Sequence, residues 1–103
     1  LISAYESARA NIEETSGRVY NIGGGPENTI SLLDLLGHLE DRLGRDIPVE
    51  YDDWRPGDQP VYVSDIRKAE REFGWSPDVG WREGVDQLLE WVQANQNLLA
   101  RLV

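Results

Sequence analysis

The sequence predicts a single α/β domain with about four helices and three short strands. Apolar residues recur every three or four positions, as in amphipathic helices, at 1–12, 32–43, 66–73 and 81–92. Short runs rich in β-branched and aromatic residues, typical of strands, stand at 18–22, 47–51 and 61–63. The chain has 103 residues, a length that supports one core of modest size.

Composition excludes several classes of function. The chain has 19 acidic and 10 basic residues, and its net charge of -9 would repel a polyanion, so we expect no nucleic-acid partner. Cysteine is absent, which excludes disulfides and thiolate metal sites. The sequence contains neither a signal-peptide core nor an apolar run of membrane-spanning length, so we expect a cytoplasmic protein that does not enter a membrane.

The first predicted helix begins at residue 1 without a capping residue. We expect a longer protein of which these residues are a fragment. The expected buried face of this helix carries apolar side chains at helical spacing, namely Leu1, Tyr5, Ala8 and Ile12.

A strand at 18–22 is predicted to end at Gly23–Gly24–Gly25, ahead of the second helix. Strand, glycine loop and helix is also the layout of a phosphate cradle. The segment lacks a third spaced glycine and a Walker lysine, and it carries Glu27 and Asp34 where a phosphate would need positive potential. The pattern therefore favours a tight connection over a phosphate site.

The helix at 32–43 has clear boundary signals. Ser31 and Asp34 form a capping-box pattern, and Gly44 is a stop. His38 lies four residues after Asp34 and three before Asp41, so we expect it to be ion-paired within the helix and not catalytic. The predicted buried stripe is Leu32, Leu36, Leu39 and Leu43.

Two further helices are predicted in the last third of the chain. Asp65 is the expected cap of the third helix, and Gly74 its stop. The last helix begins at Trp81, and an apolar tail at 98–103 follows it, which could cover a partner or a second copy. Its predicted stripe is Trp81, Val85, Leu88 and Val92.

The segment 54–65 is the part of the sequence that reads most clearly as a binding site. Arg55 offers a rigid fork of donors suited to an anionic group, and Pro56–Gly57 predicts a bend that turns Arg55 and Asp58 toward one space. Tyr62 follows on the next strand. We expect Trp54 to pack in the core or at its rim.

Metal binding is a weaker interpretation of this segment. Asp52 and Asp53 are adjacent in sequence, so their carboxylates would point apart on an extended chain, and an arginine lies close by. We therefore expect no metal site.

Several motifs together resemble the C-terminal region of the extended short-chain dehydrogenases/reductases, the NAD-dependent epimerases and dehydratases of nucleotide sugars. Within this family the sequence of residues 54–59 is most similar to the branch of the CDP-paratose (tyvelose) 2-epimerases. The matching motifs are Val19–Gly25, Ser31–Leu35, Arg55–Ala69, Phe73–Pro77 and Glu83–Gly84.

The resemblance implies that residues 1–103 are the substrate-binding part of a Rossmann-type enzyme that acts on a CDP- or UDP-linked sugar. It implies that Arg55 binds the diphosphate, that Asp58 contacts a ribose hydroxyl and that Tyr62 shapes the sugar pocket. The Gly-rich NAD fingerprint and the Tyr-x-x-x-Lys catalytic pair of the family do not occur here. We therefore expect NAD and catalysis to belong to an N-terminal Rossmann domain missing from this chain, and the fragment alone to bind no cofactor.

Two further expectations remain open. The unpaired strand edge at 18–22 and the apolar ends of the chain favour self-association. The alternative function is a stand-alone, non-enzymatic interaction module in which the arginine turn is only structural.

Overall fold

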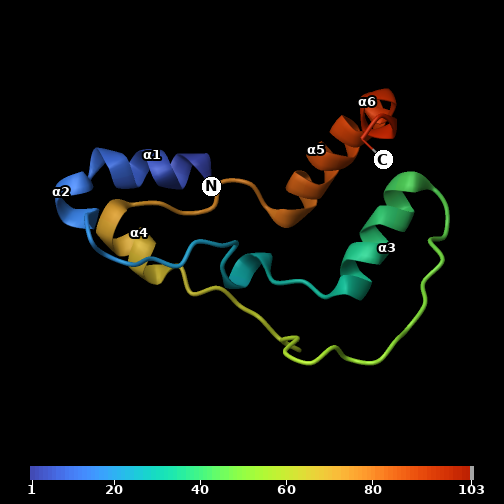
Figure 1. Cartoon of the computed structure of the whole chain (residues 1–103), viewed down its shortest axis with the longest axis horizontal. Helices are drawn as coiled ribbons and strands as arrows, with labels where there is room; N and C mark the ends of the chain where they lie inside the picture. The colour runs from blue at the N-terminus through green and yellow to red at the C-terminus, as the bar shows by residue number, and fades with distance from the viewer. Residues whose placement is uncertain (103) are drawn as a thin grey trace.

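The computed structural model describes residues 1–102 and shows a helical chain with long extended connections (Figure 1). Its elements are α1 Ile2–Ala10, α2 Ile12–Thr15, the 3-10 helix η1 Pro26–Asn28, α3 Leu32–Leu43, α4 Arg67–Phe73, α5 Trp81–Ala94 and α6 Gln96–Ala100.

The predicted α/β class is wrong for residues 1–102, because these residues contain no strand. The segments 18–22, 47–51 and 61–63 run without helical or strand structure. A strand needs a neighbouring strand to complete its hydrogen-bond ladder, and the described part of the chain supplies no such neighbour. The residue types in these segments suit a sheet, but composition alone cannot provide a pairing partner.

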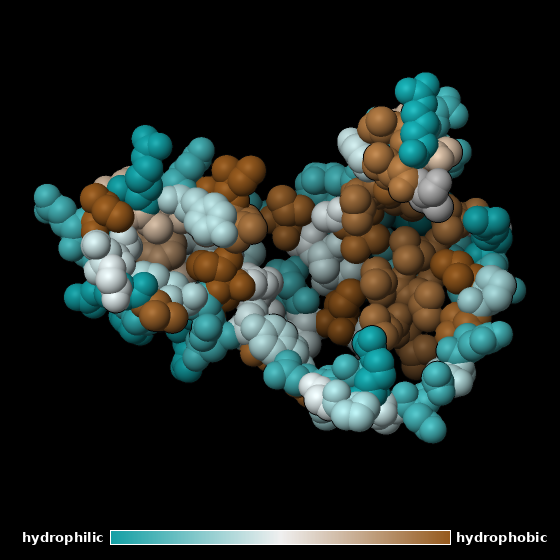
Figure 2. Space-filling view, in the orientation of Figure 1, coloured by the Kyte–Doolittle hydropathy of each residue, from teal (hydrophilic) through white to brown (hydrophobic). Residues whose placement is uncertain are grey.

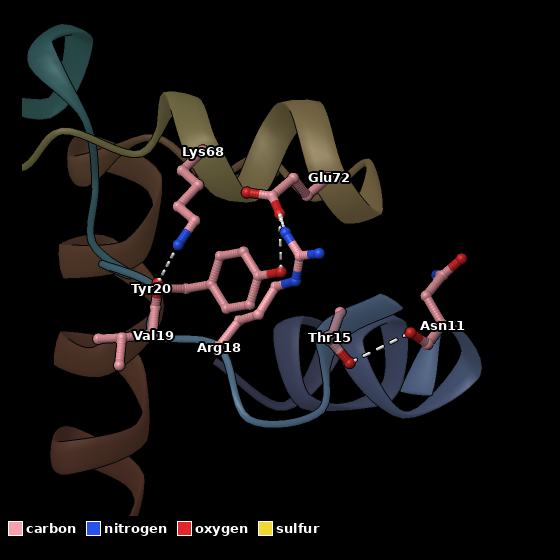
Figure 3. A network of polar contacts seen from close by, with 7 residues as sticks. All are labelled: Asn11, Thr15, Arg18, Val19, Tyr20, Lys68 and Glu72. Atoms are coloured by element: carbon pink, nitrogen blue, oxygen red, sulfur yellow. Dashed lines mark hydrogen bonds and ion pairs between the residues drawn. The ribbon is translucent and has the colours of Figure 1, made fainter. Parts of the chain in front are cut away.

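The segment 18–22 is instead attached to α4 by side chains (Figure 3). Lys68 Nζ donates to the carbonyl oxygen of Val19 at 2.8 Å and lies 4.8 Å from the ring centre of Tyr20. Glu72 accepts hydrogen bonds from Arg18 at 2.9 Å and from the Tyr20 hydroxyl at 3.3 Å. Burial and the neighbouring Glu72 carboxylate raise the pKa of Tyr20. These contacts hold the segment in an extended conformation without a sheet.

The core lies between α1 and α4. Tyr20 meets Phe73 edge to face, with ring centres 4.9 Å apart, and Trp75 Nε1 donates to Ser3 Oγ at 3.1 Å. Ala8 and Ile22 pack against the same cluster. The buried hydrophobic residues are Ala4, Ile66, Ala69, Phe73 and Trp75.

The predicted buried face of the first helix is largely wrong. Leu1, Tyr5 and Ile12 are exposed, whereas Ala4 is buried and Ala8 packs against the core. Large apolar residues marked the wrong face because the small alanine side chains are the ones turned toward α4.

The predicted helix boundaries are confirmed more closely. Ser31 Oγ accepts the Asp34 N–H at 3.0 Å, and the Asp34 carboxylate accepts the Ser31 N–H at 3.3 Å. Gly44 and Gly74 end α3 and α4 in the left-handed conformation, with φ of 67° and 69°. The predicted cap of α4 is wrong by one residue: Ile66 is the N-cap and has no side-chain cap bond, whereas Asp65, just before it, accepts the N–H of Arg67 at 3.2 Å.

Six of the eight residues in the predicted stripes of α3 and α5 are partly buried, and two are exposed. Leu36, Leu39 and Leu43 are partly buried, as are Trp81, Val85 and Val92. Leu32 and Leu88 are exposed, and neither helix contains a fully buried residue. The apolar tail forms α6 in its first part.

The molecule is open. Its radius of gyration is 17.6 Å, whereas a compact domain of this length has about 13 Å. Figure 1 shows the connection from α3 to α4 arching away from the helices, and Figure 2 shows apolar side chains gathered around α3 and toward α5. Among the described residues, no helix combines the length and apolar character needed to cross a membrane.

Candidate functional site

The arginine turn has the predicted bend. The Asp58 N–H donates to the Arg55 carbonyl oxygen at 3.1 Å, which closes a turn over Pro56 and Gly57. Gly57 has a φ of 87°, a value that favours glycine at the third position of such a turn. Local sequence chemistry was therefore sufficient to predict this bend.

The turn brings the two predicted charged residues together. Arg55 Nε donates to Asp58 Oδ2 at 3.2 Å, and the side chains are 85% and 38% exposed. Exposed ion pairs of this kind contribute about 0 to 1 kcal/mol. The guanidinium is thus oriented by Asp58 while most of its surface stays open to solvent.

The aromatic residues of this segment are not packed. Trp54 is 72% exposed, so the expectation that it packs in the core or at its rim is wrong. Tyr62 is 65% exposed, and within residues 1–102 no hydrogen bond joins it to Arg55 or Asp58. The predicted site residues therefore share one exposed segment without forming an enclosed pocket.

A hollow lies elsewhere, between the glycine loop and the start of α4. It measures about 790 Å³ and is lined by Gly24–Asn28, Val63–Arg67, Glu70 and Ser76–Pro77. Arg67 is the cationic side chain among these lining residues, and Asp65 holds it through Nε at 2.9 Å and Nη2 at 2.7 Å. The side-chain and backbone hydrogen bonds from Arg67 lower the pKa of Asp65 to about 2. Carboxylates outnumber cations in this lining, which does not suit a phosphate.

Packing explains the glycine loop, as predicted. A Cβ on Gly23 would lie 2.6 Å from Ser64 Oγ, and one on Gly24 would lie 2.8 Å from Asn28 Cβ. The buried Ser64 hydroxyl accepts the N–H of Gly25, whose φ is 74°, at 2.8 Å. The loop leads into η1 before α3 begins, so it does not form the N-terminus of a long helix.

Sequence reasoning missed Asn28, which connects this loop to α5. Its Nδ2 donates to the Gly24 carbonyl oxygen at 2.8 Å, and its Oδ1 accepts the Trp81 N–H at 2.8 Å. Asn28 therefore caps α5 from a distant loop, because Gly80 at the cap position has no side chain. A cap from so far along the chain leaves no local signal.

His38 is bonded to a carboxylate, but not to one of its own helix. Its Nε2–H donates to Asp86 Oδ1 of α5 at 2.7 Å, and Arg42 donates to Oδ2 of the same carboxylate. Trp81 meets the imidazole edge to face, with ring centres 5.2 Å apart. Helical spacing predicted Asp34 or Asp41 as the partner of His38. The partner is instead Asp86, which lies on another helix.

Chemically, the arginine turn offers an exposed guanidinium and a carboxylate beside it. Within residues 1–102, no three His, Cys, Asp or Glu side chains are grouped so that they could hold a metal ion. The exposed guanidinium can bind an anion.

Comparison with known proteins decides the family. The chain is 37% identical over 94 residues, 91% of its length, to CDP-paratose 2-epimerase of Salmonella typhi. It is 36% identical to dTDP-glucose 4,6-dehydratase of Streptomyces griseus over 85% of the chain, and 31% identical to UDP-glucose 4-epimerase of Bacillus subtilis over 84%. The chain is therefore homologous to one part of the nucleotide-sugar epimerases and dehydratases, consistent with the C-terminal region of an extended short-chain dehydrogenase/reductase.

The match to this family is partial in length. The chain spans 28%, 26% and 25% of the 2-epimerase, the dehydratase and the 4-epimerase, respectively. No protein-family model matches the chain. The predicted resemblance to the epimerases and dehydratases is confirmed, and the match to the 2-epimerase agrees with the predicted branch.

Proposed function

We propose that residues 1–103 are the nucleotide-sugar-binding part of an NAD-dependent epimerase, dehydratase or reductase, with Arg55 clamping the diphosphate of the substrate. The observation that carries this proposal is the exposed Arg55–Asp58 turn in a chain of this family. The names of the relatives connect the family to CDP-, UDP- and dTDP-linked sugars.

Electrostatics support Arg55 as the clamp. Its bond to Asp58 is solvent-exposed and so costs little to exchange. A diphosphate offers more charge and more acceptor oxygens than one carboxylate, and a planar guanidinium can bind it with two parallel bonds. With net charge -9, the chain needs a local cation to hold an anion at all.

Asp58 and Tyr62 complete the proposed contacts. Once Arg55 turns to a diphosphate, the Asp58 carboxylate is free to accept bonds from a ribose diol. The exposed ring of Tyr62 offers an apolar face and a hydroxyl to the sugar.

The surface of the chain supports a larger parent protein. The accessible surface is 8825 Å², whereas a compact monomer of this mass exposes about 5,900 Å². The difference of about 2,900 Å² is of the size that obligate partners cover. We assign this cover to an N-terminal Rossmann domain of the same protein, which would also hold NAD and the catalytic pair.

Binding of the free diphosphates tests this function. Isothermal titration of the full-length protein with CDP, UDP and dTDP should show saturable binding of at least one of them, and the corresponding nucleosides should bind far more weakly. The stand-alone module is the alternative, favoured only by the absence of an enclosed pocket around Arg55 within residues 1–102. It predicts no binding of any diphosphate and a natural protein with no Rossmann domain.

A further inference from the structure

Helices α3 and α5 are joined by hydrogen bonds at a single carboxylate. Asp86 of α5 uses Oδ1 to accept a bond from His38 Nε2 at 2.7 Å, and it uses Oδ2 to accept a bond from Arg42. Both donors lie on α3, one turn apart. Among residues 1–102, these are the hydrogen bonds that connect the two helices.

Apolar packing between these two helices is only partial. Neither α3 nor α5 contains a fully buried residue, and Leu32 and Leu88 are 78% and 62% exposed. Helices in proteins are normally held together by their buried apolar faces. Here the orientation of α5 on α3 must depend heavily on the polar contacts.

These polar contacts are shielded from solvent well enough to help hold α5 against α3. The side chains of His38 and Asp86 are 14% and 23% exposed, and Trp81 covers the imidazole from the side. Charges in such a position are screened less than exposed pairs, so removing one partner leaves the other poorly compensated.

We propose that Asp86 is a charge-dependent latch, which in its ionised form fixes α5, with α6 behind it, against α3. Loss of the charge releases the two helices from each other. The latch controls how far the apolar surface around α3 and α5 opens (Figure 2). It does not depend on sugar binding.

The surroundings define when the latch opens. His38 and Arg42 face Asp86 from α3, and a hollow of about 460 Å³ beside His38 is lined by Asp34 and Asp41 of α3 and Arg82 of α5, among others. Burial raises the pKa of Asp86, but the hydrogen bonds from His38 and Arg42 outweigh it and lower the pKa.

Release on acidification follows protonation of Asp86, whose pKa lies below 3.8, the ordinary value of this carboxyl.

Paired spin labels on α3 and α5 test the latch. The chain contains no cysteine, so Leu33→Cys on α3 and Gln93→Cys on α5, both exposed, can be labelled selectively in the full chain. At neutral pH the wild-type background should give one narrow interspin distance. Asp86→Asn, which keeps the shape and removes the charge, should broaden the distribution and add longer distances.

Matched variants separate the latch from general charge effects. Glu90→Gln removes an exposed carboxylate from the same helix and should leave the narrow distance unchanged. Arg42→Gln, from the α3 side, should reproduce part of the broadening, and it serves as the test if Asp86→Asn does not fold. A narrow, unshifted distance in a folded Asp86→Asn or Arg42→Gln chain would overturn the proposal.

Discussion

At the scale of single residues, close contacts in the glycine loop give the sharpest expectation. Gly23 has a negative φ, so the cost of Gly23→Ala comes from the contact of the new Cβ with buried Ser64, at 2.6 Å. We expect a loss of about 1 to 3 kcal/mol of stability, as in other overpacked sites. Urea denaturation measures it.

Gly37→Ala is the control for that substitution. Gly37 lies inside α3, and an alanine Cβ there would meet no neighbouring atom within 4 Å. Alanine should therefore stabilise the chain at this position by about 0.5 to 1 kcal/mol. Equal effects of the two substitutions on stability would show that the glycine loop can relax to accommodate the added Cβ at position 23.

The ion pair at the start of α4 gives a pH prediction. Hydrogen bonds from Arg67 lower the pKa of Asp65 from 3.8 to about 2. A lowered carboxyl pKa stabilises the fold above the unfolded value, and this contribution is lost as pH falls from 3.8 toward 2. Carboxyl NMR should show Asp65 titrating near 2, and Arg67→Gln should return its pKa toward 3.8. A titration midpoint of Asp65 near 3.8 in the wild type would contradict the ion pair between Asp65 and Arg67.

Residue chemistry also decided what the sequence could predict. Pro56–Gly57 encodes its own turn, and Ser31 with Asp34 encodes its own cap, because every atom involved lies within a few residues. The partner of His38 lies on another helix, and no local pattern names it. The exposure of Trp54 likewise depends on what the rest of the fold leaves uncovered.

At the scale of elements, α5 depends on a cap supplied by a distant loop. Asn28→Ala removes the acceptor for the Trp81 N–H and the donor to Gly24. We expect a loss of about 1 to 2 kcal/mol. Hydrogen exchange should localise it, with faster exchange at the first turn of α5.

Asn21→Ala is the matched control for the cap, since Asn21 is exposed and is not part of this connection. It should leave exchange in α5 unchanged. If Asn28→Ala also leaves the Trp81 amide protected, the cap does not hold the helix.

Helix ends were predicted well where the residues that determine them lie next to each other in the sequence. Helix boundaries at Gly44 and Gly74 follow from glycine alone. The three predicted strands failed because a strand exists only with a partner, and within residues 1–102 none is available. The prediction of the buried face of α1 was wrong because the position of the neighbouring helix, and not side-chain size, determines which residues are buried.

At the scale of the whole molecule, uncovered apolar surface should drive self-association of the chain expressed alone. Its accessible surface exceeds that of a compact monomer by about 2,900 Å². Sedimentation velocity should show larger species as concentration rises. A chain that stays monomeric at high concentration would show that the exposed apolar surface does not drive association.

The central claim is that Arg55 clamps the diphosphate of a nucleotide sugar, and calorimetry tests it most directly. In the full-length protein, Arg55→Ala should weaken binding by about 2 kcal/mol, or about thirtyfold, through loss of a charge-assisted bond. Arg45→Ala, an exposed arginine earlier in the same connection, should leave affinity unchanged. Equal affinities of the wild type and the Arg55→Ala variant would contradict the claim.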